Sequence, residues 1–361
     1  VSGPLSDLAV HADLTVPEGQ LVVEGRADLT GSDPRYRLEG EAREVRLEHL
    51  IAGVPGETLV SGGFVIEGAG VGPETAQATL HLDLGRGSFA AHDVRGGSGH
   101  LSVRDGVLHV DSLVVRTEAG LITAKGDLGL VEGRRGTLEL RANAAALETL
   151  QPIFFPDAPF AMAADTGRYR VGGSAQLEAR IAGSIHDLEA RGRVRATEIL
   201  FDRVRLRRAT VTFAAAGVGT DAFRYEVGFT ADSLRAPGRL FATVEGNATY
   251  AEAGGQAEIE AHAILPEPQH YRVVSDFRHD GLTATDFDLL EVYARTGAGE
   301  WELAEPAGIR VATDGLRVTD LLLRQTDGSG QIRADGHLAW RADSTAADLP
   351  AAFRLDLVDG P

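Results

Sequence analysis

The chain has 361 residues, a net charge of −18 and no cysteine. The negative charge argues against nucleic acid as a partner and against a broad electrostatic hold on an anionic membrane, because both need clustered cations. The lack of cysteine excludes disulfides and thiol or iron–sulfur chemistry, and it leaves the redox compartment open.

Residues 1–140 are predicted to form strands of roughly six to eleven residues that are joined by turns. Two short helices are expected to interrupt this pattern, at Leu47–Gly53 and at Ala144–Phe155, where leucines take helical spacing close to a proline. Strands resume near Ala175 and continue in the same style to Leu357. The chain is therefore predicted to be all-β, with one elongated, continuous antiparallel-type sheet and one or two short helices.

The segment Pro156–Gly173 is rich in proline, alanine and glycine and is predicted to be the least regular part of the chain. A joint at 144–173 would divide the protein into 1–155 and 174–361. The chain begins and ends in mid-pattern, so we expect it to be one repeat-built β segment of a longer protein.

Three stretches follow one template, in which every second residue after a glycine is apolar or small. They start at Gly19, Gly120 and Gly330, and a weaker copy starts at Gly238. A strict period of two predicts strands with one apolar face and one polar face. A second glycine recurs mid-strand at the same offset, where the backbone can bend or be approached closely. The repetition predicts a function that belongs to the sheet rather than to a catalytic cluster.

The apolar face of these copies is the candidate functional surface. Its lining residues, chosen from the phase of the pattern alone, are Leu21, Val23, Ile122, Ala124, Leu128, Leu130, Ile332, Ala334 and Leu338. Aromatic residues are only 6% of the chain, so the lining is expected to be smooth and aliphatic. A flat sheet with such a face exposed would aggregate, and no predicted helix is long enough to cover it. The face must curl in on itself or be filled by a ligand.

No motif in the sequence supports catalysis, a metal site or a cofactor. There is no Gly-x-Ser-x-Gly nucleophile elbow and no HExxH spacing. His262, Glu267 and His270 are close in sequence, but they flank two prolines and are interpreted as part of a solvated turn. Gly68, Gly70 and Gly72 are interpreted as a hairpin connection, because no helix or Lys-Ser/Thr follows them. The protein is predicted not to be an enzyme.

One basic cluster stands out in this acidic chain. It consists of Arg203, Arg205, Arg207 and Arg208. These arginines would meet lipid headgroups if they lay at the edge of a groove. The alternative is a solvated outer face on which they pair with Asp and Glu of neighbouring strands.

The run Gly106–Leu130 places a strand, a turn and a second strand around a spaced pair of glycines followed by leucine. It resembles the recurring unit of the AsmA-like proteins, especially the TamB (translocation and assembly module) family. Leu177–Phe213 is similar to another recurrent strand pair of that family, and Ala144–Phe155 resembles the short helix that caps such blocks. The resemblance covers most of the chain as patterns, without an invariant motif. The characteristic C-terminal region of TamB is not evident, so the chain resembles an internal segment.

The resemblance implies a U-shaped sheet (a β-taco) in the periplasm of a Gram-negative-type bacterium, anchored to the inner membrane through a segment outside this chain. Its groove would carry phospholipid acyl chains towards the outer membrane, with an outer-membrane assembly protein of the BamA class as a further partner. The leading hypothesis is thus a non-enzymatic lipid-transfer conduit for envelope biogenesis. The alternative is a structural β-solenoid or adhesin-like spacer with a closed interior, which predicts a period of roughly 20–25 residues.

Overall fold

The computed structural model describes residues 1–16, 19–46, 58–89, 92–150, 171–201, 204–218, 220, 222–252, 254–280, 284–312, 315–339 and 351–359. The described residues form β-strands almost throughout, with one 3-10 turn, η2 (Leu147–Leu150). Neighbouring strands pair antiparallel along the chain, as in β1–β2, β2–β3 and β3–β4. The predicted all-β class and antiparallel sheet are confirmed.

The predicted helices and the predicted joint fall mainly on residues that are not described. Leu47–Gly53 lies outside the described residues. Of Ala144–Phe155, the described part contains the end of a strand and η2, and residues 151–155 lie outside it. Most of the proposed joint is also outside the described residues, and a strand already begins at Val171. The division into 1–155 and 174–361 stays a prediction.

The chain divides into two compact units. The first comprises Val1–Ala145, Gln176–Gly192 and Gly217–Thr220, and the second comprises Ala146–Ala175, Arg193–Ala216 and Asp221–Pro361. The strands of the first unit are β1 (Leu8–Val16), β2 (Gly19–Asp28), β3 (Arg35–Arg46), β4 (Leu59–Ala69), β5 (Gln77–Leu84), β6 (Gly87–Phe89), β7 (His92–Arg104), β8 (Val107–Thr117), β9 (Gly120–Gly129) and β10 (Gly136–Ala144). Three strands contribute residues to both units: β11 (Val171–Ser184), β12 (Asp187–Phe201) and β13 (Val204–Val218).

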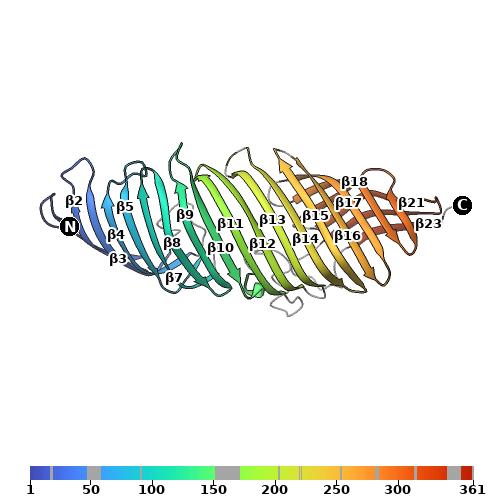
Figure 1. Cartoon of the computed structure of the whole chain (residues 1–361), viewed down its shortest axis with the longest axis horizontal. Coiled ribbons are helices and arrows are strands. Elements are labelled where there is room, and N and C mark those ends of the chain that lie inside the picture. The colour runs from blue at the N-terminus through green and yellow to red at the C-terminus, as the bar shows by residue number, and fades with distance from the viewer. Residues whose placement is uncertain are drawn as a thin grey trace. The chain divides into compact units, whose positions relative to one another are not determined.

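The second unit continues with ten strands of similar character. They are β14 (Arg224–Ala236), β15 (Arg239–Ala251), β16 (Gly254–Leu265), β17 (Gln269–Asp280), β18 (Ala284–Thr296), β19 (Gly299–Leu303), β20 (Ala307–Ala312), β21 (Gly315–Gln325), β22 (Gly330–Ala339) and β23 (Ala351–Asp359). From β13 to β18 each strand pairs with the next (Figure 1). The short strands β19 and β20 together bridge β18 to β21, and β22 and β23 complete the order.

The alternation expected from sequence governs which side chains face water. In β3, Arg37 and Glu39 are exposed, while Leu38 and Gly40, which alternate with them, are half-buried. Asp105-Gly106 connects β7 to β8 as a tight hairpin, and Gly70–Ala76 connects β4 to β5. Gly70 and Gly72 therefore lie in a hairpin connection, as expected, because they join two antiparallel strands, whereas Gly68 still belongs to β4.

Bulges interrupt the period of two without moving the apolar residues to the other face. Val110 and Leu113 of β8 pair with alternate residues of β9, so β8 carries one extra residue. Both Asp111 and Ser112, which lie within this bulge, are exposed. One extra residue would otherwise turn every later side chain to the opposite face. The sequence shifts its pattern by one position at the same place, so the apolar residues stay together.

The mid-strand glycine of the template has a steric reason. Gly126 has a φ of +126°, and a Cβ there would collide with the carbonyl oxygen of Thr137 on β10. Gly25, at the same offset in the first copy, would collide with the carbonyl oxygen of Arg37 on β3. The neighbouring backbone therefore approaches at the position where the template has no side chain.

We expect Gly126→Ala to lower the free energy of unfolding by about 1–3 kcal/mol, because alanine must adopt a strained φ against a backbone oxygen. Urea unfolding followed by circular dichroism measures the change. Gly31→Ala is the matched control, since its nearest heavy atom would lie 3.7 Å away. It should shift the free energy by no more than about 0.5 kcal/mol. Equal midpoints for the two variants would contradict the steric explanation.

Candidate functional site

The apolar residues of the first unit form rows that cross its strands. Residues directly opposite each other in an antiparallel pair point to the same face, so the register traces each row from strand to strand. The central row consists of Ala12, Val23, Gly40, Phe64, Leu82, Gly99, Leu113, Ala124 and Leu140. An apolar row thus runs without interruption across β1–β5 and β7–β10.

Two further rows flank the central row on the same face. One consists of Leu14, Leu21, Ala42, Gly62, Leu84, Gly97, Val115, Ile122 and Ala142, and the other of Val10, Gly25, Leu38, Ile66, Leu80, Leu101, Val110, Gly126 and Leu138. We call these three rows the apolar face of the first unit. Leu21 shares a row with Ile122, and Val23 shares one with Ala124. Equivalent positions of two template copies therefore lie in the same row.

Most side chains of this apolar face are half-buried. Leu21, Val23 and Ile122 are neither buried nor exposed, and the smaller Ala124 is 7% exposed. Leucines from both neighbouring strands, Leu82 and Leu113, close over Gly99, which has no side chain. Of the larger side chains of this face, Val110 is buried, Leu14 is exposed and the others are half-buried. The face therefore keeps accessible aliphatic surface where an ordinary core would be closed.

The remaining predicted lining residues of the first unit lie at the edge of this face. Leu128 of β9 is opposite Leu108 of β8, in a row next to the one that contains Val110. Leu130 follows the end of β9 and is half-buried, and its backbone N–H donates to the carbonyl of Gly106 at 2.8 Å. Their placement agrees with an apolar face, while a lipid role for any of these residues stays a prediction.

The predicted residues near the C-terminus lie on β22, in the second unit. Ile332 is opposite Leu323, and Ala334 is opposite Leu321 and 8% exposed. The backbone of Leu338 pairs with Leu316, and the side chain of Leu338 lies outside the described part. The template copy of β22 thus contributes to an apolar face of the second unit.

The second unit also contains an aromatic cluster that the sequence patterns did not reveal. Its rings come from β14, β15, β17 and β18, and they are Tyr225, Tyr250, Phe277 and Phe287. Successive ring centroids lie 5.2, 6.0 and 5.9 Å apart. This cluster departs from the expected smooth aliphatic lining. The composition could not show it, because few aromatic residues are enough when the register brings them into one row.

A glycine makes this aromatic row continuous. Tyr250 and Phe277 lie on β15 and β17, and between them β16 presents Gly255. The ring of Phe277 lies over Gly255, where a side chain would otherwise stand, and stacks on Tyr250. Beyond it, the hydroxyl of Tyr225 lies 2.9 Å from Nε2 of His279, and burial raises the pKa of Tyr225. The cluster therefore has an apolar body and a polar end.

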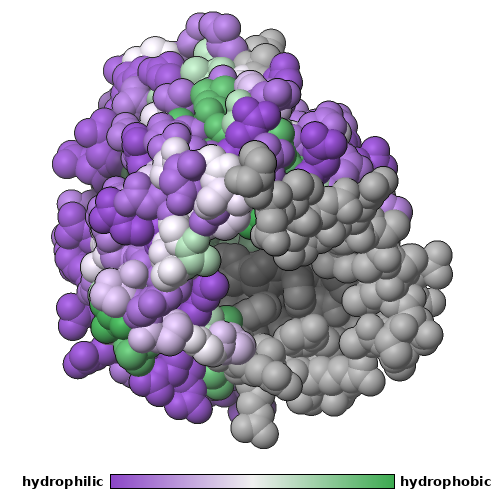
Figure 2. All heavy atoms as spheres, turned by 90° about the vertical axis from the view of Figure 1, so that its right-hand side faces the viewer, coloured by the Kyte–Doolittle hydropathy of each residue, from purple (hydrophilic) through white to green (hydrophobic). Residues whose placement is uncertain are grey.

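The opposite face of the strands is hydrophilic. In the first unit Arg37 pairs with Glu67 at 2.9 Å and His11 with Glu24 at 3.1 Å, and all four side chains are exposed. Exposed pairs of this kind add little stability. Seen from the C-terminal side, the surface of the described residues is largely hydrophilic and is interrupted by apolar patches (Figure 2). The chemistry of the two faces therefore differs as the period of two predicts.

The arginine group lies on an exposed part of β13. Arg205 and Arg207 are exposed, and Arg208 lies 3.8 Å from Asp232 of β14. Arg203 lies outside the described residues. The contact with Asp232 favours the solvated outer face over a headgroup site.

The interpretation of the histidines near Pro266 as parts of a turn was wrong. His262 lies on β16 and His270 on β17, directly opposite each other in the register. The carboxylate beside them is Glu260, two residues before His262 on β16, rather than Glu267. The signal that the sequence did contain was the Glu-x-His alternation on one face of a strand, followed by a second histidine after a short connection.

No family model, curated protein or solved structure matches this chain. The resemblance to the AsmA-like and TamB proteins therefore rests on the residue patterns alone. Among the described residues, no helix combines the length and apolarity that a membrane crossing requires.

We expect Ile122→Asp to weaken binding of an apolar fluorescent probe such as N-phenyl-1-naphthylamine, because the charge would lie on the apolar face. Losing one buried aliphatic contact costs about 1.5 kcal/mol or more, which is about tenfold in affinity. Leu121→Asp is the control, since Leu121 is the preceding residue, is 40% exposed and points to the other face. Fluorescence titration measures both. Equal losses in the two variants would mean that the probe does not bind the apolar face.

Proposed function

We propose that this protein is a non-enzymatic lipid-transfer conduit that holds phospholipid acyl chains on its apolar face. The observation that carries the proposal is the three rows of half-buried aliphatic residues that cross the first unit from β1 to β10. An acyl chain would remove this surface from water. The polar outer face and the polar connections between strands would remain hydrated.

The energetics of such binding need no hydrogen bond to the lipid. Each methylene that leaves water contributes about 0.8 kcal/mol, so a pair of acyl chains is held by contact with aliphatic side chains alone. Transfer along the face also needs neighbouring positions of similar energy. The three rows favour this, because every long strand of the first unit contributes an apolar residue or a glycine to each of them.

The cellular setting follows from the family resemblance and belongs to the same proposal. An AsmA-like or TamB-type segment would act in the periplasm of a Gram-negative-type bacterium, anchored to the inner membrane by another part of the protein. It would deliver phospholipid to the outer membrane, where a BamA-class assembly protein would be its partner. The net charge of −18 suits a conduit that does not adsorb broadly to anionic membrane surfaces.

The alternative of a closed solenoid spacer is less well supported. Repeat β-helices stack short parallel strands, and their interiors are filled by their own side chains. Here the strands from β14 to β18 have 12 or 13 residues and pair antiparallel. The length and the antiparallel pairing of these strands therefore favour a sheet with an open apolar face over a closed solenoid.

Purification without detergent, followed by solvent extraction and mass spectrometry, tests the proposal. We expect phospholipid to co-purify in a fixed ratio to the protein. A soluble protein that contains no lipid, and takes up none from vesicles, would overturn the conduit and favour the closed spacer.

Photo-crosslinking can map where the lipid lies. We expect a benzophenone amino acid at Leu82 to form a phospholipid adduct, because Leu82 lies in the central row. The same group at His81, the preceding residue of β5, should form no such adduct, because His81 is exposed on the other face. Adducts are detected by mass spectrometry of the intact protein. Equal adduct yields at the two positions would place the lipid elsewhere.

A further inference from the structure

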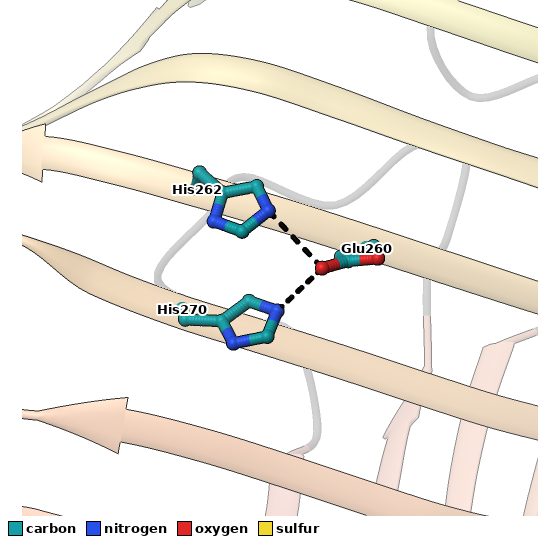
Figure 3. A group of neighbouring side chains, drawn as sticks. All are labelled: Glu260, His262 and His270. Carbon is teal, nitrogen blue, oxygen red and sulfur yellow. Dashed lines mark hydrogen bonds and ion pairs between the residues drawn. The ribbon is translucent and has the colours of Figure 1, made fainter.

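Three potential metal ligands converge on the outer face of the second unit. Nε2 of His270 lies 2.7 Å and Nε2 of His262 lies 3.1 Å from the same oxygen, Oε1 of Glu260 (Figure 3). One ligand atom from each residue can be chosen so that all three lie within 4.8 Å of one another. Two imidazole nitrogens and one carboxylate oxygen therefore point to a common position.

The three side chains converge because of the alternation along β16 and the register between β16 and β17. Glu260 and His262 are two residues apart on β16, so both side chains are on the same face. His270 lies directly opposite His262 on β17, and their rings stack with centroids 4.4 Å apart and planes 6° from parallel. The register of β16 and β17 thus sets the spacing of the two imidazoles, and the carboxylate of Glu260 contacts both of them.

The surrounding charges favour a cation. Glu245 of β15 is directly opposite Glu260, which adds a second carboxylate on the same face. Two arginines lie next to the group on this face, and both are paired with carboxylates. Arg272, directly opposite Glu260, pairs with Glu258 and Glu291, each at 2.8 Å, and Arg295, directly opposite His270, pairs with Glu300 at 2.8 Å. Carboxylates therefore outnumber unpaired cations around the two imidazoles.

We propose that Glu260, His262 and His270 form a binding site for a divalent transition-metal cation, with Zn²⁺ as the natural candidate. Imidazole and carboxylate ligands suit Zn²⁺, whereas Mg²⁺ and Ca²⁺ take oxygen ligands. The cation would replace the hydrogen bonds between the rings and Glu260, with each ligand atom about 2.0–2.2 Å from the metal. Water would complete the coordination, since the side chains are 28–46% exposed. The bound ion would tie β16 to β17.

The chain supplies a natural comparison in the first unit. His109 and Asp127 lie on β8 and β9 with Nδ1 and Oδ1 2.7 Å apart, which is the same kind of contact across two paired strands. The described residues contain no second histidine that joins this pair as a metal-ligand group. A site that needs three ligands should therefore form at His270 and not at His109.

Zinc titration of the whole chain, with a chromogenic chelator as competitor, tests the site. We expect about one tightly bound Zn²⁺ per chain, and no competition from Mg²⁺ at equal concentration. His270→Ala should weaken zinc binding by at least about 10- to 100-fold, the range that loss of even a supporting residue produces. His109→Ala should leave zinc affinity unchanged.

Two further measurements separate a metal site from a change in folding. Co²⁺ should give visible absorption bands with the wild type and with His109→Ala, and these bands should vanish in His270→Ala and in Glu260→Gln. Zn²⁺ should raise the thermal unfolding midpoint of the wild type and not that of His270→Ala. Without metal, the circular dichroism spectra of the variants and the wild type should coincide, because each substituted side chain is at least 28% exposed. The proposal is overturned if no zinc binds, or if His270→Ala binds zinc as the wild type does.

Discussion

An aliphatic face that no helix of the described residues covers is the constraint on which this structure depends. Each strand alternates apolar and polar residues, so half of its side chains gain free energy only if their face leaves water. In the first unit the row that contains Val23 and Ala124 crosses every long strand, and most of its residues are half-buried. A surface of this kind lowers its free energy when an apolar ligand covers it. The proposed lipid role is based on this gain in free energy.

Two backbone features keep the apolar face continuous. Bulges such as that between Ala42 and Val45 of β3 insert a residue, and the apolar pattern shifts with them, so both residues stay on the same face. Glycines remove side chains where a neighbouring strand or ring must come close. Phe64 lies over Gly40 in the first unit as Phe277 lies over Gly255 in the second. Interruptions of the simple pattern are thus part of how the face is built.

The two faces of the same strand support different chemistry. On β16, Ala261 points to the apolar side, while Glu260 and His262 point to the outer side with the ligand atoms of the proposed metal site. Because side chains alternate, substitutions on one face leave the other largely intact. The aromatic cluster of Tyr250 and Phe277 also shows that the apolar side is not uniform along the chain. The apolar rows of the first unit are mainly aliphatic, whereas those of the second unit include stacked rings.

The sequence by itself determined the all-β class, the two-faced strands and the hairpin connections, since these follow from local periodicity and from glycine-containing turns. It also put Leu21 and Ile122 in the same phase, and the register places them in one row. Tertiary structure alone decided which residues meet across strands. The sequence pointed to Glu267 beside His262 and His270, whereas the register of β16 and β17 brings Glu260 to them. Which side chains become neighbours depends on the register and on the bulges of the paired strands. Local sequence patterns specify neither of them.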